Sequence, residues 1–147
     1  MRRWTAVSGR ERGFTLVELV VVMTIIAILA GALALQIGNR VQHAKRTRAL
    51  QDVATMKSAL ELYRADNGDY PTSQQGLDAL YHKPSSPPVP TNWERYLDKP
   101  IQYDPWLSEY IYRCPGQEDP DGYDLISYGK DRKPGGADND ADITNMD

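Results

Sequence analysis

One run of apolar residues constrains the fold of this chain more than any other feature. From Phe14 to Gly38 the chain carries a single charged residue, Glu18, among mostly Val, Ile, Leu and Ala. As a helix this run is about 37 Å long, which is enough to cross a hydrocarbon core of about 30 Å. The run therefore predicts a membrane-spanning helix. Glu18 needs a partner there, because an unpaired carboxylate in a membrane span is costly.

The charges on either side of this run predict its orientation. Four arginines precede it (Arg2, Arg3, Arg10 and Arg12), so residues 1–13 are interpreted as a cytoplasmic leader and everything after Gly38 is expected across the membrane. The net charge is −3, and these basic residues lie before a hydrophobic span and not on a folded face. The pattern therefore argues against a nucleic-acid partner.

The helical pattern continues beyond the apolar run. Five apolar residues recur at spacings of four and three, which places them on one helical face: Ala49, Val53, Met56, Leu60 and Tyr63. Gly68 suits the position after a helix end, and Pro71 follows it. We expect one continuous helix from about Phe14 to Asn67, roughly 80 Å long.

The rest of the chain predicts a small α+β domain. Thr72 and Gln75 have the spacing of a helix cap, and "GLDALY" continues as a short helix. "EYIYRC" and "YDLISYG" have the composition of strands and are separated by the turn-forming "PGQEDPDG". The final stretch, "KDRKPGGADNDADITNMD", is expected to be a loop. The soluble part is thus a helix laid on a small antiparallel sheet.

The residue types that usually carry catalysis do not form a recognisable set. Cys114, the single cysteine, is expected to be a half-buried strand residue, and His43 and His82 lie in no metal-ligand or catalytic spacing. The aromatic residues Trp93, Trp106, Tyr110 and Tyr112 are expected to pack in the domain. The chain is therefore not expected to be an enzyme.

The start of the apolar run resembles a known processing signal. A basic leader ending in Gly13, followed by Phe14, Thr15 and Glu18, is similar to the class III signal of type IV pilins and of the pseudopilins of type II secretion. The resemblance implies that a prepilin peptidase cleaves after Gly13 and methylates the new amine of Phe14. It also implies the partner of Glu18, which is the Phe14 amine of a neighbouring subunit in a filament.

Later blocks extend the resemblance to the major pseudopilins of type II secretion. In order they are "YRADNGDYPTSQQGLDALYHKP", "YDPW", "YRCPG", "YDLISYGKD" and "NDADITN". The family implies a pilin-like fold and an inner-membrane subunit with a periplasmic carboxyl-terminal domain. This subunit polymerises into a filament that drives export of folded proteins through the outer membrane. The implied partners are other copies of the chain, minor pseudopilins, the prepilin peptidase and an inner-membrane assembly platform.

The resemblance divides the chain into three parts and shows two departures. The parts are a cleaved leader at residues 1–13, a transmembrane and assembly helix at 14–38, and a periplasmic domain at 39–147. Leu35 stands where the family commonly has a proline, and Asn145 is followed by Met146 where the family often has tryptophan.

The acidic tail predicts a cation site of a particular kind. Asp138, Asp140 and Asp142 alternate as in an EF-hand, but Ile143 occupies the place of the required glycine, which excludes that motif. The resemblance implies instead a calcium site with the carboxylates of Asp131, Asp140 and Asp142 and main-chain carbonyls at Tyr128 and Lys133. Which of the three alternating aspartates binds remains open.

Three other interpretations compete with the pseudopilin. A secretory signal peptide cleaved after Ala32-Leu33-Ala34 would release a soluble domain beginning at Leu35. A membrane-anchored binding module or adhesin would leave Glu18 unpaired. A type IV pilus, or another pilin-like filament, would keep the assembly helix and change only the system it serves.

Overall fold

The computed structural model describes residues 13–146 and divides the chain into two units, one up to Asn39 and one from Arg40. Helix α1 (Leu16–Asn67) contributes its first part to one unit and its second part to the other. The structure therefore contains the long helix that the sequence predicts, beginning two residues later than expected. The helix continues without interruption through Leu35, the position at which the family commonly has a proline.

In the first unit the structure describes an apolar helix that is exposed from Leu16 to Leu33. The window Leu16–Leu33 has a mean hydropathy of 2.7 and none of it is buried. Thr15 caps the helix, since its Oγ1 accepts a hydrogen bond from the main-chain N–H of Glu18 at 3.2 Å. In length and composition this segment meets the requirements of a membrane span.

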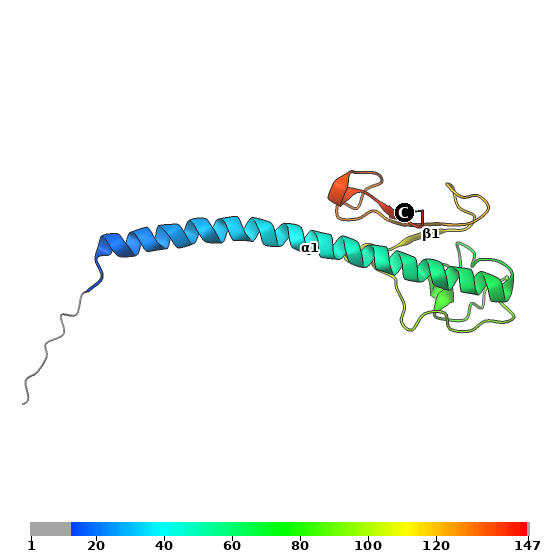
Figure 1. The fold of residues 1–147 in the computed structure, drawn as a ribbon. Helices are drawn as coiled ribbons and strands as arrows, with labels where there is room; N and C mark the ends of the chain where they lie inside the picture. The colour runs from blue at the N-terminus through cyan, green and yellow to red at the C-terminus, as the bar shows by residue number, and fades with distance from the viewer. Residues whose placement is uncertain (1–12, 147) are drawn as a thin grey trace, which may run out of the picture. The chain divides into compact units, whose positions relative to one another are not determined.

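The second unit is built on the later part of α1, alongside which the sheet lies (Figure 1). The predicted face is buried, with Ala49, Met56 and Leu60 fully enclosed and Val53 and Tyr63 nearly so. These side chains pack with residues of the rest of the domain, namely Ala79, Leu80, Leu97, Trp106, Tyr110, Tyr123, Leu125 and Ile143. One helical stripe thus supplies more than a third of the buried core residues.

The helix ends where the sequence predicts. Gly68 follows with a φ of 94°, and its N–H donates to the carbonyl of Arg64 at 2.8 Å. This left-handed conformation is open to glycine and strained for other residues, which explains why the helix stops at Asn67.

Three antiparallel strands form the sheet, in the order β1-β2-β3. β1 (Ile111–Arg113) and β2 (Asp124–Ser127) are the two predicted strands, and they pair with Tyr112 opposite Leu125. Every residue of β2 is buried. The central strand therefore lies between its two neighbours and against the core.

One expectation for the domain was wrong in detail, and one was confirmed. The C-terminal stretch is not all loop, because it contains the 3-10 helix η2 (Asp138–Asp140) and the strand β3 (Ile143–Thr144), which pairs with β2. The expected short helix after Gln75 is a 3-10 helix, η1 (Leu77–Leu80), preceded by Gly76 at a φ of 62°. The one-turn η2 and the two-residue β3 are too short to show a hydrophobic period, so the sequence pattern did not identify them.

The predicted cap before η1 does form, as a closed turn. The N–H of Thr72 donates to Gln75 Oε1 at 3.0 Å, and the N–H of Gln75 donates to Thr72 Oγ1 at 3.2 Å. Because Gly76 then takes a left-handed conformation, these bonds stabilise a turn and do not start an α-helix.

Candidate assembly site and calcium loop

The N-terminal site consists of exposed residues at the start of α1. Phe14 and Leu16 are each 79% exposed, and a Cβ added at Gly13 would contact nothing within 4 Å. Gly13 is thus exposed. The leader that precedes it, residues 1–12, lies outside the described residues.

Glu18 is the single carboxylate of the apolar segment. It lies in the first turn of α1, where the positive end of the helix dipole favours a negative charge. Within residues 13–146 no ion pair includes it. By contrast, the hydroxyl of Thr24, in the same segment, donates to the carbonyl of Val20 at 2.8 Å and is satisfied within the helix. Glu18 is therefore the group of this segment that still needs a partner from elsewhere.

The C-terminal loop carries the residues proposed to bind calcium. Asp131 Oδ1 accepts a hydrogen bond from the N–H of Lys133 at 3.1 Å, and Asp142 Oδ2 accepts one from the N–H of Gly135 at 2.8 Å. Asp140 lies at the end of η2, and its carbonyl oxygen approaches Gly136 so closely that an added Cβ would clash. Gly136, at a φ of 96°, is thus a position that only glycine can occupy.

The loop does not gather its aspartates around one point. Among the described residues, no three side chains of His, Cys, Asp or Glu come together as a metal site. Asp142 stands out, because its Oδ1 is buried and has no hydrogen-bond partner among the residues that the structure describes. A buried carboxylate oxygen without a donor is a costly arrangement, and a cation would satisfy it.

Cationic side chains of α1 hold the loop by its main chain. Arg46 Nη1 donates to the carbonyl of Ala141 at 2.7 Å, and Lys57 Nζ donates to the carbonyl of Asn145 at 2.8 Å. The Asn145 side chain in turn accepts a hydrogen bond from the N–H of Leu125 at its Oδ1, and its Nδ2 donates one to the carbonyl of Tyr123. The loop is thus attached both to the helix and to the sheet.

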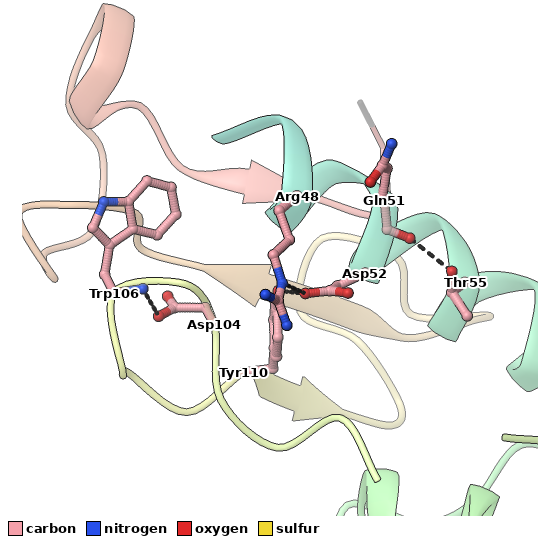
Figure 2. Close-up of polar contacts among 7 residues, drawn as sticks. All are labelled: Arg48, Gln51, Asp52, Thr55, Asp104, Trp106 and Tyr110. Atoms are coloured by element: carbon pink, nitrogen blue, oxygen red, sulfur yellow. Dashed lines mark hydrogen bonds and ion pairs between the residues drawn. The ribbon is translucent and has the colours of Figure 1, made fainter. Parts of the chain in front are cut away.

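A buried carboxylate organises the turn beside the loop, and the sequence analysis missed it. Asp104 is 3% exposed, and its Oδ1 accepts a hydrogen bond from the N–H of Trp106 at 2.9 Å (Figure 2). The Asp104 Oδ1 also accepts the N–H of Ser108 at 2.9 Å. Its Oδ2 accepts the hydroxyl of Ser127 at 2.6 Å. An aspartate followed by proline is typical of such a side-chain-stabilised turn, so the "YDPW" block could have predicted the turn from the sequence. The hydrogen bond to Ser127 joins two residues that are 23 positions apart, so no local sequence pattern predicts it.

The same turn is connected to α1. Trp106 Nε1 donates to Gln42 Oε1 at 3.0 Å, and the hydroxyl of Tyr110 donates to Asp52 Oδ2 at 3.4 Å. Asp52 also forms an ion pair with Arg48 at 3.8 Å (Figure 2). Burial, and secondarily the nearby Asp52 carboxylate, raises the pKa of Tyr110 well above its usual value.

Cys114 and the four aromatic residues lie where the sequence predicts. Cys114 is half-buried, and burial raises the pKa of its thiol, which reduces its reactivity. His43 and His82 are exposed, and His82 Nδ1 lies 2.8 Å from Asp78 Oδ1. Trp106 and Tyr110 are buried, and Trp93 and Tyr112 pack against the core, so the predicted packing role is confirmed for all four aromatic residues.

An exposed apolar helix with one carboxylate, continuing into a small domain with an antiparallel sheet, defines a pilin-like filament subunit. The comparison with protein families supports this class at both ends of the chain. Residues 8–34 match the prokaryotic N-terminal methylation motif, and residues 36–146 match the family described as type II secretion system, protein G. The chain belongs to the type II secretion system protein G family, as the sequence blocks indicated.

Individual relatives agree with this assignment. The type II secretion system core protein G of Pseudomonas aeruginosa is 46% identical over 140 residues, covering 94% of this chain and 96% of the relative. The protein of the same name from Escherichia coli is 38% identical over 140 residues, covering 94% and 92%. The crystal structure of the major pseudopilin of enterohaemorrhagic Escherichia coli matches with a TM-score of 0.59 and 36% identity, covering 74% of this chain and 91% of that chain.

Proposed function

We propose that this chain is the major structural subunit of a type II secretion pseudopilus and assembles into a filament through the N-terminal part of α1. The observation that carries the proposal is the exposed apolar segment Leu16–Leu33 with Glu18 near its start. Such a segment needs either lipid or copies of itself around it. The chain then acts as a filament subunit and not as an enzyme, and its division at residues 13 and 38 separates leader, assembly helix and periplasmic domain.

The pairing of Glu18 with a terminal amine explains how assembly is selected. Cleavage after Gly13 creates a positive amine at Phe14, one helical turn from Glu18. In a single subunit both charges lie at the edge of the membrane. In the filament, the Glu18 carboxylate of an incoming subunit meets the Phe14 amine of its neighbour, and both charges are neutralised in an apolar environment. The pairing also sets the axial position of the new subunit.

The charge distribution orients the subunit in the inner membrane. The arginines before Gly13 keep the N-terminal end cytoplasmic, which places the domain from Arg40 onward in the periplasm. There it contacts other copies of the chain and minor pseudopilins, while the prepilin peptidase and the assembly platform act at the membrane. The filament then drives folded proteins toward the outer membrane.

The C-terminal loop is proposed to bind calcium. The chemistry of the donors fits a hard cation, since the loop offers carboxylates at Asp131, Asp140 and Asp142 together with main-chain carbonyls at Tyr128 and Lys133. The buried, unpartnered Asp142 Oδ1 supports this, because a bound cation would compensate its charge. Calcium would cross-link the loop, and Arg46 and Lys57 would hold the loop's main chain on α1.

The mature N-terminus is the decisive measurement for the proposed function. Intact mass and terminal peptide sequencing of the membrane-extracted protein should give a chain that begins with N-methylated Phe14. A chain beginning at Leu35 would mean that the hydrophobic segment is discarded, and the filament proposal would then be wrong.

A further inference from the structure

Leu107 and Arg132 are two exposed residues that share an unfavourable backbone conformation and lie close together. Leu107 has a φ of 66° and is 78% exposed, and Arg132 has a φ of 59° and is also exposed. Arg132 Nη2 donates to the carbonyl of Trp106, the residue before Leu107, at 2.6 Å. Side chains with a Cβ disfavour this left-handed region, so its occurrence at two neighbouring exposed residues indicates a role outside the fold.

The buried Asp104 holds the turn that carries Leu107. Its carboxylate accepts the N–H groups of Trp106 and Ser108, and its carbonyl accepts the N–H of Leu107 at 3.0 Å. The turn therefore presents Leu107 outward on a fixed base. Tyr103, which precedes the turn, is 53% exposed, so an aromatic side chain accompanies the aliphatic one.

Arg132 belongs to a short segment with two further exposed cations, Lys130 and Lys133. Together with Leu107 these three cations form the basic tip. Among the residues that the structure describes, no ion pair includes any of the three. With Asp131 between them, residues 130–133 carry a net charge of +2 (three positive, one negative). An exposed apolar side chain beside several cations is the combination that binds an anionic membrane surface.

The basic tip contacts α1 close to the end of the apolar run. Trp106 Nε1 donates to Gln42 Oε1 at 3.0 Å, and Gln42 lies four residues after Gly38. Four residues cover about 6 Å in a helix and at most about 14 Å when extended. The headgroup layer of a bilayer extends roughly 5–7 Å beyond the hydrocarbon core. The contact therefore lies at or just above the headgroups, whatever direction the second unit takes.

Further cations lie on the same part of the helix. Arg46, one turn after Gln42, donates to the carbonyl of Ala141 at 2.7 Å and so holds the C-terminal loop at this level. The exposed Arg40 and the half-buried Lys45 add two more positive charges to these turns of α1. This concentration of positive charge is complementary to anionic headgroups and not to neutral ones.

We infer that the basic tip docks onto the anionic phospholipid headgroups of the membrane that the apolar segment spans. This inference rests on the proposed function, because it requires that segment to lie in lipid. It concerns the subunit before assembly, since copies of the chain replace lipid around the segment in a filament. The aspartates of the same loop belong to the proposed calcium site, where a bound cation offsets their charge.

Quenchers attached to lipid test the docking in the full chain. Leu107→Cys, in a Cys114→Ser background, carries a fluorophore and is reconstituted into vesicles that contain nitroxide-labelled phosphatidylcholine and calcium. Quenching should be at least about threefold stronger when the vesicles also contain phosphatidylglycerol, and salt at about 1 M should remove this difference. The control label is Val89→Cys, at 53% exposure, which should show no such difference.

Removing two cations of the basic tip should weaken the docking. Each lysine near an anionic membrane strengthens binding about fivefold. The double variant Lys130→Gln with Lys133→Gln should therefore lower the ratio of docked to undocked domain at least about tenfold. The double variant Lys83→Gln with Lys99→Gln changes the net charge equally and should leave the ratio unchanged.

The control lysines lie toward the other end of the domain. Lys83 follows η1 and Lys99 follows Tyr96, and the N–H of Tyr96 donates to the carbonyl of the last residue of η1 at 2.9 Å. The hydroxyl of Tyr96 accepts a hydrogen bond from Asn67 Nδ2 at 2.9 Å. Asn67 ends α1 and lies about 37 Å beyond Gln42 along a helix axis.

The other outcomes overturn the inference in distinguishable ways. Inserted protein without quenching at Leu107→Cys would refute the docking and leave the proposed function standing. Equal quenching in both kinds of vesicle, or an undiminished ratio in the Lys130 and Lys133 double variant, would refute recognition of anionic headgroups. A signal that follows the number of subunits per vesicle and not the lipid would assign the tip to a second copy, which also refutes it. A full chain that fails to insert into vesicles would refute the membrane span of the proposed function, and the inference with it.

Discussion

Asp142 is the residue of the C-terminal loop that a cation would affect most. Its Oδ2 accepts a hydrogen bond from the N–H of Gly135, whereas its buried Oδ1 has no hydrogen-bond partner in the described part of the chain. Without a cation, this oxygen lowers the free energy of unfolding, because its lost hydration is not replaced. With calcium, the same oxygen becomes a ligand. The effect of removing its charge should therefore depend on the metal.

Asp142→Asn tests this dependence. In chelator, we expect the variant's unfolding midpoint to equal or exceed that of the unmodified chain. Calcium at about one hundred times its dissociation constant should raise the unmodified midpoint by about 10 °C and the variant's by much less. Circular dichroism of the full chain in detergent measures both. Asp98→Asn, at an exposed position outside the loop, serves as the comparison, and equal calcium responses in the unmodified chain and Asp142→Asn would rule out Asp142 as a ligand.

Among the elements, the turn around Asp104 depends most on a single side chain. The carboxylate accepts two main-chain N–H groups and the Ser127 hydroxyl, and through Ser127 it reaches the end of β2. Ser127 Oγ also accepts the N–H of Gly129, where the C-terminal loop begins. The turn, the sheet and the loop thus share one buried hydrogen-bond network. Removing the Asp104 carboxylate would leave several of its donors without an acceptor at once.

Asp104→Ala should destabilise the domain strongly. Three hydrogen bonds are lost and buried donors are left without acceptors, so the free energy of unfolding should fall by about 3 kcal/mol. Denaturant unfolding of the full chain in detergent gives this quantity. The exposed Asp98→Ala is the control and should change it by less than about 0.5 kcal/mol. A loss below about 1 kcal/mol for Asp104→Ala would show that the network is dispensable.

The tyrosines that pack around the sheet predict a loss of stability at alkaline pH. Burial is the main cause that raises the pKa of Tyr110, Tyr112 and Tyr123 above the ordinary value of 10.0. Since the folded state holds these protons more tightly, their contribution to stability is complete below pH 10 and is lost as the pH rises above it. Phenolate absorbance and near-ultraviolet circular dichroism, followed together in a pH titration, should change together.

Tyr123→Phe isolates one of these groups. Its buried hydroxyl has no hydrogen-bond partner among the described residues, so phenylalanine removes an unsatisfied group as well as an ionisable one. We expect the variant to unfold at a higher pH than the unmodified chain. Tyr103→Phe, at a residue that is 53% exposed, is the control, and an equal shift in both variants would contradict the argument.

The elements also show what the sequence could and could not predict. The buried stripe of α1 was predictable because five apolar residues repeat with the helical period, and its end was predictable because Gly68 permits a left-handed turn. β3 was missed because two residues carry no period, and the contact between Asp104 and Ser127 was missed because a pair 23 residues apart leaves no local pattern. The aspartates of the proposed site were identified by resemblance, whereas the isolated Asp142 oxygen is visible only in the structure.

For the whole molecule, the two units use α1 for different purposes. From Leu16 to Leu33 the apolar side chains of the helix are exposed, and after Arg40 a stripe of them is buried in the domain core. Processing and filament assembly should therefore depend on the first unit, while thermal stability should depend on the second. One variant in each unit tests this separation when processing, filament assembly and thermal unfolding are all measured for both variants.

Leu60→Ala and Glu18→Gln should have opposite profiles. Leu60 is fully buried, so its truncation should lower the free energy of unfolding by about 3 kcal/mol and leave methylation of Phe14 unchanged. Glu18→Gln should leave the unfolding midpoint unchanged and reduce filament yield at least about tenfold, because the Phe14 amine loses its carboxylate partner. Thr24→Ala, whose hydroxyl bonds within the helix, is the control for the first unit and should assemble normally. If Glu18→Gln lowered the midpoint, or if Leu60→Ala prevented methylation, the two units would not be separable in function.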